Sequence, residues 1–124
     1  MVTELTVQDM QTPTETDDNN IHVVMFYGTT CGPCKATMPN YEQMAIDFTN
    51  MNARIKFFTI DAWNPQEQRE YCTNVQGIKG VPHFKAFCKE QVIFEKVGGG
   101  DLAEMHRMTN EIVDEAFKRF GEKY

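Results

Sequence analysis

Long hydrophobic runs are absent from this sequence. None approaches the roughly 18 consecutive apolar residues of a membrane-spanning helix, and the opening Met1-Val2-Thr3-Glu4-Leu5 lacks the positive charge followed by an apolar stretch that marks a secretion signal. Positive charge is also scarce, since the formal net charge is -6. That balance argues against nucleic acid or an anionic membrane as the main partner. A cytoplasmic location is therefore expected.

The composition is that of one ordinary soluble domain. The 124 residues are 41% hydrophobic and 24% charged, which is enough to bury one core without disulfide staples or metals. No internal repeat or linker interrupts the chain, so residues 1–124 are predicted to form a single domain that acts as a monomer. Cys72 and Cys88 lack a second C-x-x-C spacing, so neither a disulfide framework nor a metal site is expected.

Hydrophobic patterning predicts alternating strands and helices. The run from Ile21 to Tyr27 is apolar and β-branched at its start, as in a strand covered on both faces. The other predicted strands are residues 3–7, 54–60, 84–88 and 92–97, and the predicted helices are residues 32–50, 65–75 and 102 onward. Residues 8–20 are polar and are expected to be irregular or briefly helical. Parallel crossovers followed by a hairpin imply a mixed sheet between layers of helices.

Helix boundaries carry their own signals. Pro39 should kink the helix in which it lies. Asn64 is a candidate N-cap with Pro65 at the first helical position. Asp101 followed by Glu104 resembles a capping box, so the last helix is expected to begin immediately after Asp101.

The cysteines outside the C-x-x-C motif have two interpretations each. Cys88 adjoins the predicted hairpin turn, Lys89-Glu90-Gln91, and its expected exposure would permit disulfide-linked dimers. Cys72 lies near the end of a predicted helix. It is expected to be a small buried hydrophobe, the alternative being a regulatory thiol that is oxidised.

The chemistry is concentrated in Cys31-Gly32-Pro33-Cys34, directly after a buried strand. In a helix that opens at Gly32, the first N–H groups have no intrahelical partner, and their dipoles favour a thiolate on Cys31. Cys34 lies one turn further on, where it can attack a mixed disulfide on Cys31. Pro33 suits the first helical turn because it needs no N–H there. Cys31 is thus the candidate nucleophile and Cys34 the candidate resolving thiol.

These residues resemble the thioredoxin family. Besides the CGPC motif, the resemblance rests on Pro39, five residues past the second cysteine, on Gly80-Val81-Pro82 before the hairpin and on Lys96-Val97-Gly98. It extends over nearly the whole chain. The resemblance implies an α/β thioredoxin fold, with a mixed five-stranded central sheet flanked by about four helices.

The resemblance also implies how the site is built and used. Pro82 should follow a cis peptide bond, which would place the Val81 backbone beside the cysteines to pair with an extended substrate segment. Thr30, Gly98 and Gly99 would line the same groove. The implied activity is reduction of protein disulfides with no bound cofactor. Electrons would come from a flavoprotein reductase that uses NADPH, or from glutathione.

Three positions depart from the family pattern. Thr30 stands where thioredoxins generally have tryptophan, which removes a large apolar face for partner proteins. Met25 and Phe57 stand where the family has a buried aspartate and its lysine. The two changes are consistent with each other, because a single buried charge would be costly whereas an apolar pair is not.

The missing aspartate affects the resolving step. No carboxylate is predicted behind Cys34, so water, the Cys31 thiolate or another side chain must take its proton, and resolution is expected to be slow. His83 follows the expected cis-proline and is a candidate for this proton transfer near neutral pH. The alternative is that His83 is a structural strand histidine.

Two other functions stay open at this point. A thiol oxidase or isomerase would use the same cysteines in the opposite direction, and would be favoured by a strongly stabilised Cys31 thiolate. An interaction subunit with a thioredoxin fold would bind its partner through the groove or the acidic surface, with incidental redox activity.

Overall fold

Five strands form one sheet in the computed structural model, which describes residues 2–51 and 54–124. The elements in chain order are β1 (Val2–Leu5), the 3-10 turn η1 (Val7–Asp9), α1 (Gln11–Glu15), β2 (Ile21–Tyr27), α2 (Gly32–Met51), β3 (Ile55–Asp61), α3 (Gln66–Asn74), β4 (His83–Cys88), β5 (Gln91–Val97) and α4 (Leu102–Phe120). The strand order is β1-β3-β2-β4-β5. The β1–β3 and β2–β3 pairs are parallel, and the β2–β4 and β4–β5 pairs are antiparallel. The predicted mixed sheet with four helices is confirmed.

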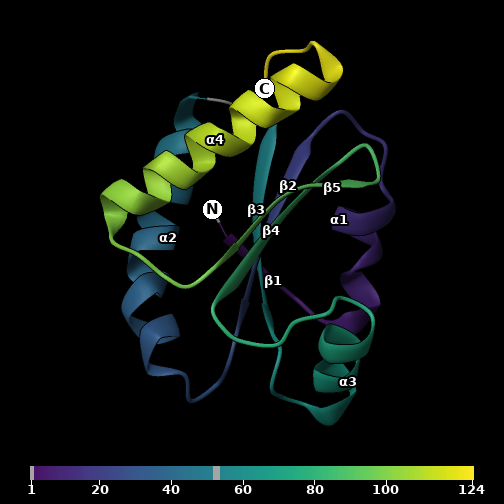
Figure 1. Ribbon diagram of the computed structural model, residues 1–124, viewed down its shortest axis with the longest axis vertical. Helices are drawn as coiled ribbons and strands as arrows, with labels where there is room; N and C mark the ends of the chain where they lie inside the picture. The colour runs from purple at the N-terminus through teal and green to yellow at the C-terminus, as the bar shows by residue number, and fades with distance from the viewer. Residues whose placement is uncertain (1, 52–53) are drawn as a thin grey trace.

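Helices cover both faces of the sheet, α2 and α4 on one and α1 and α3 on the other (Figure 1). The strands must therefore be apolar on both faces, and the first six residues of β2 are all buried. Side chains along β2 alternate between the two resulting cores. Met25 belongs to the core that contains both motif cysteines, and Phe26 to the opposite core.

The topology fixes where the functional residues meet. Because β2 and β3 are parallel, their carboxyl ends lie at the same edge of the sheet. The loop from β2 to α2 and the loop from β3 to α3 therefore begin side by side. The helix α2 is held against the sheet by a buried stripe that includes Tyr41, Met44 and Phe48. This packing positions the first turn of α2 at that edge.

Some predicted boundaries are wrong. The first strand, predicted at residues 3–7, is β1 (Val2–Leu5), because η1 already begins at Val7. The N-cap of α3 is Pro65 rather than Asn64, so α3 begins one residue later than expected. The hairpin turns through two residues rather than three, with φ of 51° at Lys89 and 65° at Glu90. The capping box of α4 is present, since the Glu104 N–H donates to Asp101 at 2.8 Å and the Asp101 N–H to Glu104 at 3.3 Å.

The expected exposure of Cys88 is also wrong. All six residues of β4 are buried, because this strand is covered by helices and lies between β2 and β5. Cys88 is 0% exposed and packs in the same core as Tyr124, so it is not available for disulfide-linked dimers. Cys72 is buried as predicted, also at 0% exposure.

Candidate active site

The motif cysteines lie at the N-terminus of α2. Cys31 immediately precedes this helix, and its carbonyl accepts the Lys35 N–H at 3.1 Å. Its Sγ accepts the Cys34 N–H at 3.2 Å, in the position where the oxygen of an N-cap side chain usually accepts. The sulfur thus receives a helix N-terminal donor, and both this hydrogen bond and the helix dipole favour negative charge on it after reduction.

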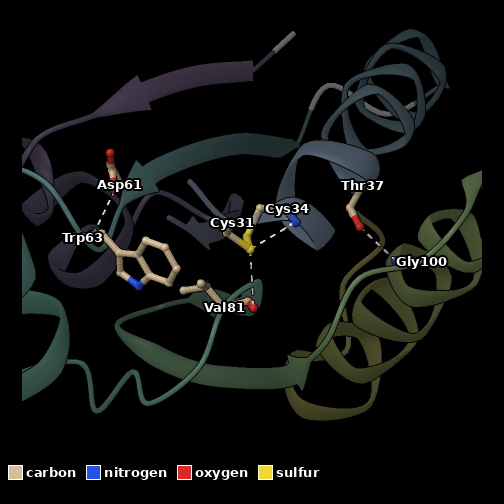
Figure 2. The surroundings of a disulfide bond; sticks show 7 residues. All are labelled: Cys31, Cys34, Thr37, Asp61, Trp63, Val81 and Gly100. Atoms are coloured by element: carbon tan, nitrogen blue, oxygen red, sulfur yellow. Dashed lines mark hydrogen bonds between the residues drawn. A yellow bond between two sulfur atoms is a disulfide. The ribbon is translucent and has the colours of Figure 1, made fainter. Parts of the chain in front are cut away.

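Cys31 and Cys34 form a disulfide, with their Cα atoms 5.3 Å apart (Figure 2). Cys34 is only 1% exposed, whereas Cys31 retains 6% exposure. Gly32 and Pro33, between them, are exposed. The outer sulfur is therefore the one that an incoming disulfide can reach, and the inner one is sheltered.

The segment before β4 approaches the disulfide from the other side. The peptide bond between Val81 and Pro82 is cis, as the resemblance implied. The Val81 carbonyl oxygen lies 3.7 Å from Cys31 Sγ. The backbone of Val81 is thus placed where an extended partner segment would run past the outer sulfur.

A glycine loop between β5 and α4 packs against the same helix turn. The Gly98 N–H donates to the Pro82 carbonyl at 2.8 Å, and the Gly100 N–H donates to Thr37 Oγ1 at 3.2 Å. A Cβ at Gly99 would overlap the Thr37 side chain, so only glycine fits there without a shift. Gly98 and Gly99 are half-buried, and Gly99 lies against Pro33 and Thr37 in the first turns of α2.

Thr30 is exposed beside Cys31, and a tryptophan comes to this edge from elsewhere in the chain. Trp63, in the loop after β3, is half-buried, and its indole covers Gly28 so closely that a Cβ there would overlap the ring. Asp61 holds the loop, accepting the Trp63 N–H at 2.9 Å. Figure 2 shows the indole on the same side of the disulfide as Val81. The sequence interpretation missed Trp63.

Apolar side chains lie behind the disulfide. Met25 is 0% and Phe57 2% exposed, in the same core as Cys34. A pocket of about 260 Å³ nevertheless reaches Cys34, and Tyr27 is among the residues that line it. The Tyr27 hydroxyl donates to Glu4 at 2.8 Å. Burial, and then this hydrogen bond, raise the pKa of Tyr27 far above its usual value, so it stays protonated.

His83 faces away from the cysteines. Its ring packs edge-on against Phe26, in the core on the α1 and α3 side, whereas its neighbour Phe84 is in the core of the cysteines. Its Nε2 lies 3.0 Å from Glu95. The sheet thus separates this imidazole from Cys34, and its geometry fits a structural strand histidine better than the proton-transfer role.

The described residues offer neither a cluster of metal ligands nor a membrane-spanning helix. Residues 2–51 and 54–124 contain no group of three or more His, Cys, Asp or Glu side chains placed to hold a metal ion. No helix in the same part of the chain is long and apolar enough to cross a membrane.

A disulfide closed across a helix N-terminus, with the carbonyl of the residue before a cis-proline beside its outer sulfur, defines the class of protein as a thiol–disulfide oxidoreductase. The sequence model of the family named Thioredoxin matches residues 2–111. The chain therefore belongs to the thioredoxin family. Members of this family generally act on protein disulfides and are reduced by thioredoxin reductase.

Individual relatives agree with this assignment. The chain is 26% identical to thioredoxin Asp f 28 of Aspergillus fumigatus over 73% of its own length and 76% of that protein. It is 33% identical to thioredoxin domain-containing protein 8 of Rattus norvegicus over 56% of its length, which spans only 48% of that relative. The crystal structure of Malassezia sympodialis thioredoxin (Mala s 13) superposes with a TM-score of 0.70 at 26% identity, covering 94% of this chain and 91% of that one.

Proposed function

We propose that the protein reduces disulfides of other proteins, with Cys31 attacking and Cys34 resolving. The Cys31 thiolate forms a bond to one substrate sulfur and releases the other as a thiolate. Cys34, after losing its proton, then attacks Cys31 Sγ and releases the second substrate thiolate. Two electrons pass to the substrate, and the protein is left with the Cys31–Cys34 disulfide present in this structure.

The observation that carries this order is the asymmetry of the two sulfurs. Cys31 Sγ accepts the Cys34 N–H at the start of α2 and is the more exposed of the pair. A thiolate is the attacking species, and a helix N-terminus favours it on Cys31. The sheltered Cys34 does not meet an incoming disulfide and reacts only with Cys31 Sγ, once that sulfur has formed the mixed disulfide.

The proton of Cys34 would leave through the pocket beside it. Met25 and Phe57 provide no proton acceptor, but the pocket of about 260 Å³ is far larger than the roughly 10–15 Å³ that one water needs. Water there can take the proton, and Tyr27, which lines the pocket, donates its hydroxyl hydrogen bond to the Glu4 carboxylate. Such a route is less direct than a carboxylate beside the sulfur, which fits a slow resolving step.

The reductant and location belong to the same proposal. The oxidised pair would be returned to the dithiol by an external flavoprotein reductase using NADPH, or by glutathione, with no cofactor bound to this chain. The protein would act as an electron carrier in the cytoplasm and as a monomer. Family membership supports the reductase arm in particular.

The test is reduction of insulin disulfides with each reductant. The native chain should be active, Cys31→Ser inactive, and Cys34→Ser should accumulate covalent mixed disulfides with its substrates. Trapping through Cys31 in the Cys34→Ser variant would also identify those substrates. Trapping by Cys34 in the Cys31→Ser variant instead would reverse the assigned roles. Full biological function of the double variant would favour an interaction subunit.

A further inference from the structure

A second cavity adjoins the active site at Val81. It has a volume of about 150 Å³, well above the roughly 10–15 Å³ that one water needs, and lies between α3, the loop after β3 and the segment that leads to Pro82. Its apolar lining includes Trp63, Ile78 and Val81, and its polar lining is Arg69, Thr73 and Lys79. Trp63 and Val81 therefore belong both to this cavity and to the surroundings of the disulfide (Figure 2).

The charge of this cavity is opposite to that of the whole chain. Arg69 and Thr73 are four residues apart on α3 and so share one face of the helix, while Lys79 approaches from the following loop. None of the lining residues is acidic. Within residues 2–51 and 54–124, no ion pair involves Arg69 or Lys79. Two uncompensated cations at one cavity, in a chain of net charge -6, favour an anionic ligand.

We infer that this cavity is a substrate subsite that takes an acidic side chain of the polypeptide whose disulfide is reduced. The inference rests on the proposed function, because a segment that pairs with the Val81 backbone brings the neighbours of its cysteine over Trp63 and toward the cavity. The methylene groups of a glutamate would pack on the indole of Trp63. Its carboxylate would pair with Arg69 and Lys79.

The kinetic test uses two synthetic peptide disulfides that differ only in having Glu or Gln beside the attacked cysteine. The native protein should reduce the Glu peptide with a kcat/KM about three- to tenfold higher at low ionic strength. Added salt should shrink this ratio, because the pairing groups are exposed. Arg69→Gln combined with Lys79→Gln should bring the ratio to one, because kcat/KM for the Glu peptide loses the contribution of this pairing.

The matched control removes the same charge elsewhere. Lys56, on β3, and Lys118, on α4, are exposed and do not line the cavity, so the variant with both changed to Gln should keep the preference. Equal rates for the two peptides, or a preference that survives in the Arg69 and Lys79 variant, would overturn the subsite while leaving disulfide reduction established. If neither peptide is reduced, the proposed function is wrong, and the subsite is then tested only by the binding experiment with serine peptides.

Binding is measured without thiol chemistry by giving both peptides serine in place of cysteine. Trp63 is the only tryptophan in the chain, so its indole N–H gives one assignable NMR signal beside the cavity. Titration with the Glu peptide should shift this signal at lower concentration than titration with the Gln peptide. The difference should vanish in the Arg69→Gln and Lys79→Gln variant. Identical titrations of the native protein by the two peptides would overturn the inference.

Discussion

Individual cysteines in this chain differ in reactivity because their surroundings differ. Cys31 is at a helix N-terminus, whereas Cys72 is fully buried in the core on the α1 and α3 side. Burial, and then the charge of Asp61, raise the pKa of Cys72 to about 12. Burial also raises the pKa of Cys88. Neither thiol therefore forms a significant amount of thiolate at neutral pH.

We accordingly expect that thiol reagents do not label the oxidised native protein at pH 8. After unfolding, two thiols, those of Cys72 and Cys88, should react. The raised pKa of Cys72 also works against stability at high pH. The unfolded thiol ionises above about pH 8.5, whereas the folded thiol stays protonated until about pH 12. The contribution of the buried neutral thiol to the free energy of unfolding is therefore fully present below about pH 8.5, and it is lost progressively as the pH rises toward 12. Dithionitrobenzoate titration with and without urea tests the reactivity. Fast labelling of the native oxidised protein would contradict the assigned burial.

The apolar pair behind the disulfide gives a second prediction at the scale of residues. Met25→Asp should lower the free energy of unfolding by about 3 kcal/mol or more at pH 8, because an unpaired carboxylate would be buried next to Phe57. The pKa of that carboxyl would be raised in the fold, so the loss should be smaller at pH 5, where protonation neutralises it. Urea unfolding at both pH values measures this.

Two further variants control this experiment. Met25→Leu should cost less than about 1.5 kcal/mol, since it conserves volume and polarity. Adding Phe57→Lys to Met25→Asp should recover part of the loss by supplying a partner charge. An equal loss for Met25→Leu and Met25→Asp would show that shape, and not charge burial, governs this position.

At the scale of elements, the sequence specified most of the fold because its signals were local. The continuous apolar run of β2 and the Asp101–Glu104 box of α4 each determine their own element, and both matched the structure. Trp63 could not be placed in this way, because its role depends on two parallel strands ending at one edge. Its position three residues after a predicted strand was the available signal. The face occupied by His83 likewise depends on strand register.

The hairpin turn was missed for a local reason that leads to a prediction. Lys89-Glu90 lacks the glycine or asparagine that usually supplies positive φ at both turn positions, yet both residues adopt it. Left-handed backbone costs a non-glycine residue roughly 1–2 kcal/mol. Glu90→Gly should therefore stabilise the protein by about 0.5–1 kcal/mol, after allowing for the greater freedom of glycine in the unfolded chain.

Chemical denaturation measures this change, and the neighbouring position provides the control. Gln91 begins β5 with ordinary strand pairing to Cys88, so Gln91→Gly should destabilise by about 0.5–1 kcal/mol. Lys89 is left unchanged because it pairs with Glu122 at 3.3 Å. A destabilised Glu90→Gly variant would mean that contacts of the Glu90 side chain outweigh its backbone strain.

At the scale of the whole molecule, the redox state of one disulfide is coupled to the stability of the entire domain. The cysteines are three positions apart, so the cross-link closes a very small loop. Even so, their surroundings are assembled from distant segments: α2, Val81 before β4 and the glycines before α4. Loss of order in any of these segments would disturb the surroundings of the two cysteines.

The oxidised protein should be more stable than the reduced one by about 2 kcal/mol, the chain-entropy contribution of a loop of about four residues. The helix N-terminal donor opposes part of this gain, because it stabilises a Cys31 thiolate in the reduced fold. Urea midpoints of the two forms, at equal slopes, give the difference. In the Cys31→Ser and Cys34→Ser double variant, reductant should leave the midpoint unchanged. A reduced form at least as stable as the oxidised one would mean that thiolate stabilisation outweighs the cross-link, which is the balance expected of a thiol oxidase and not of a reductase.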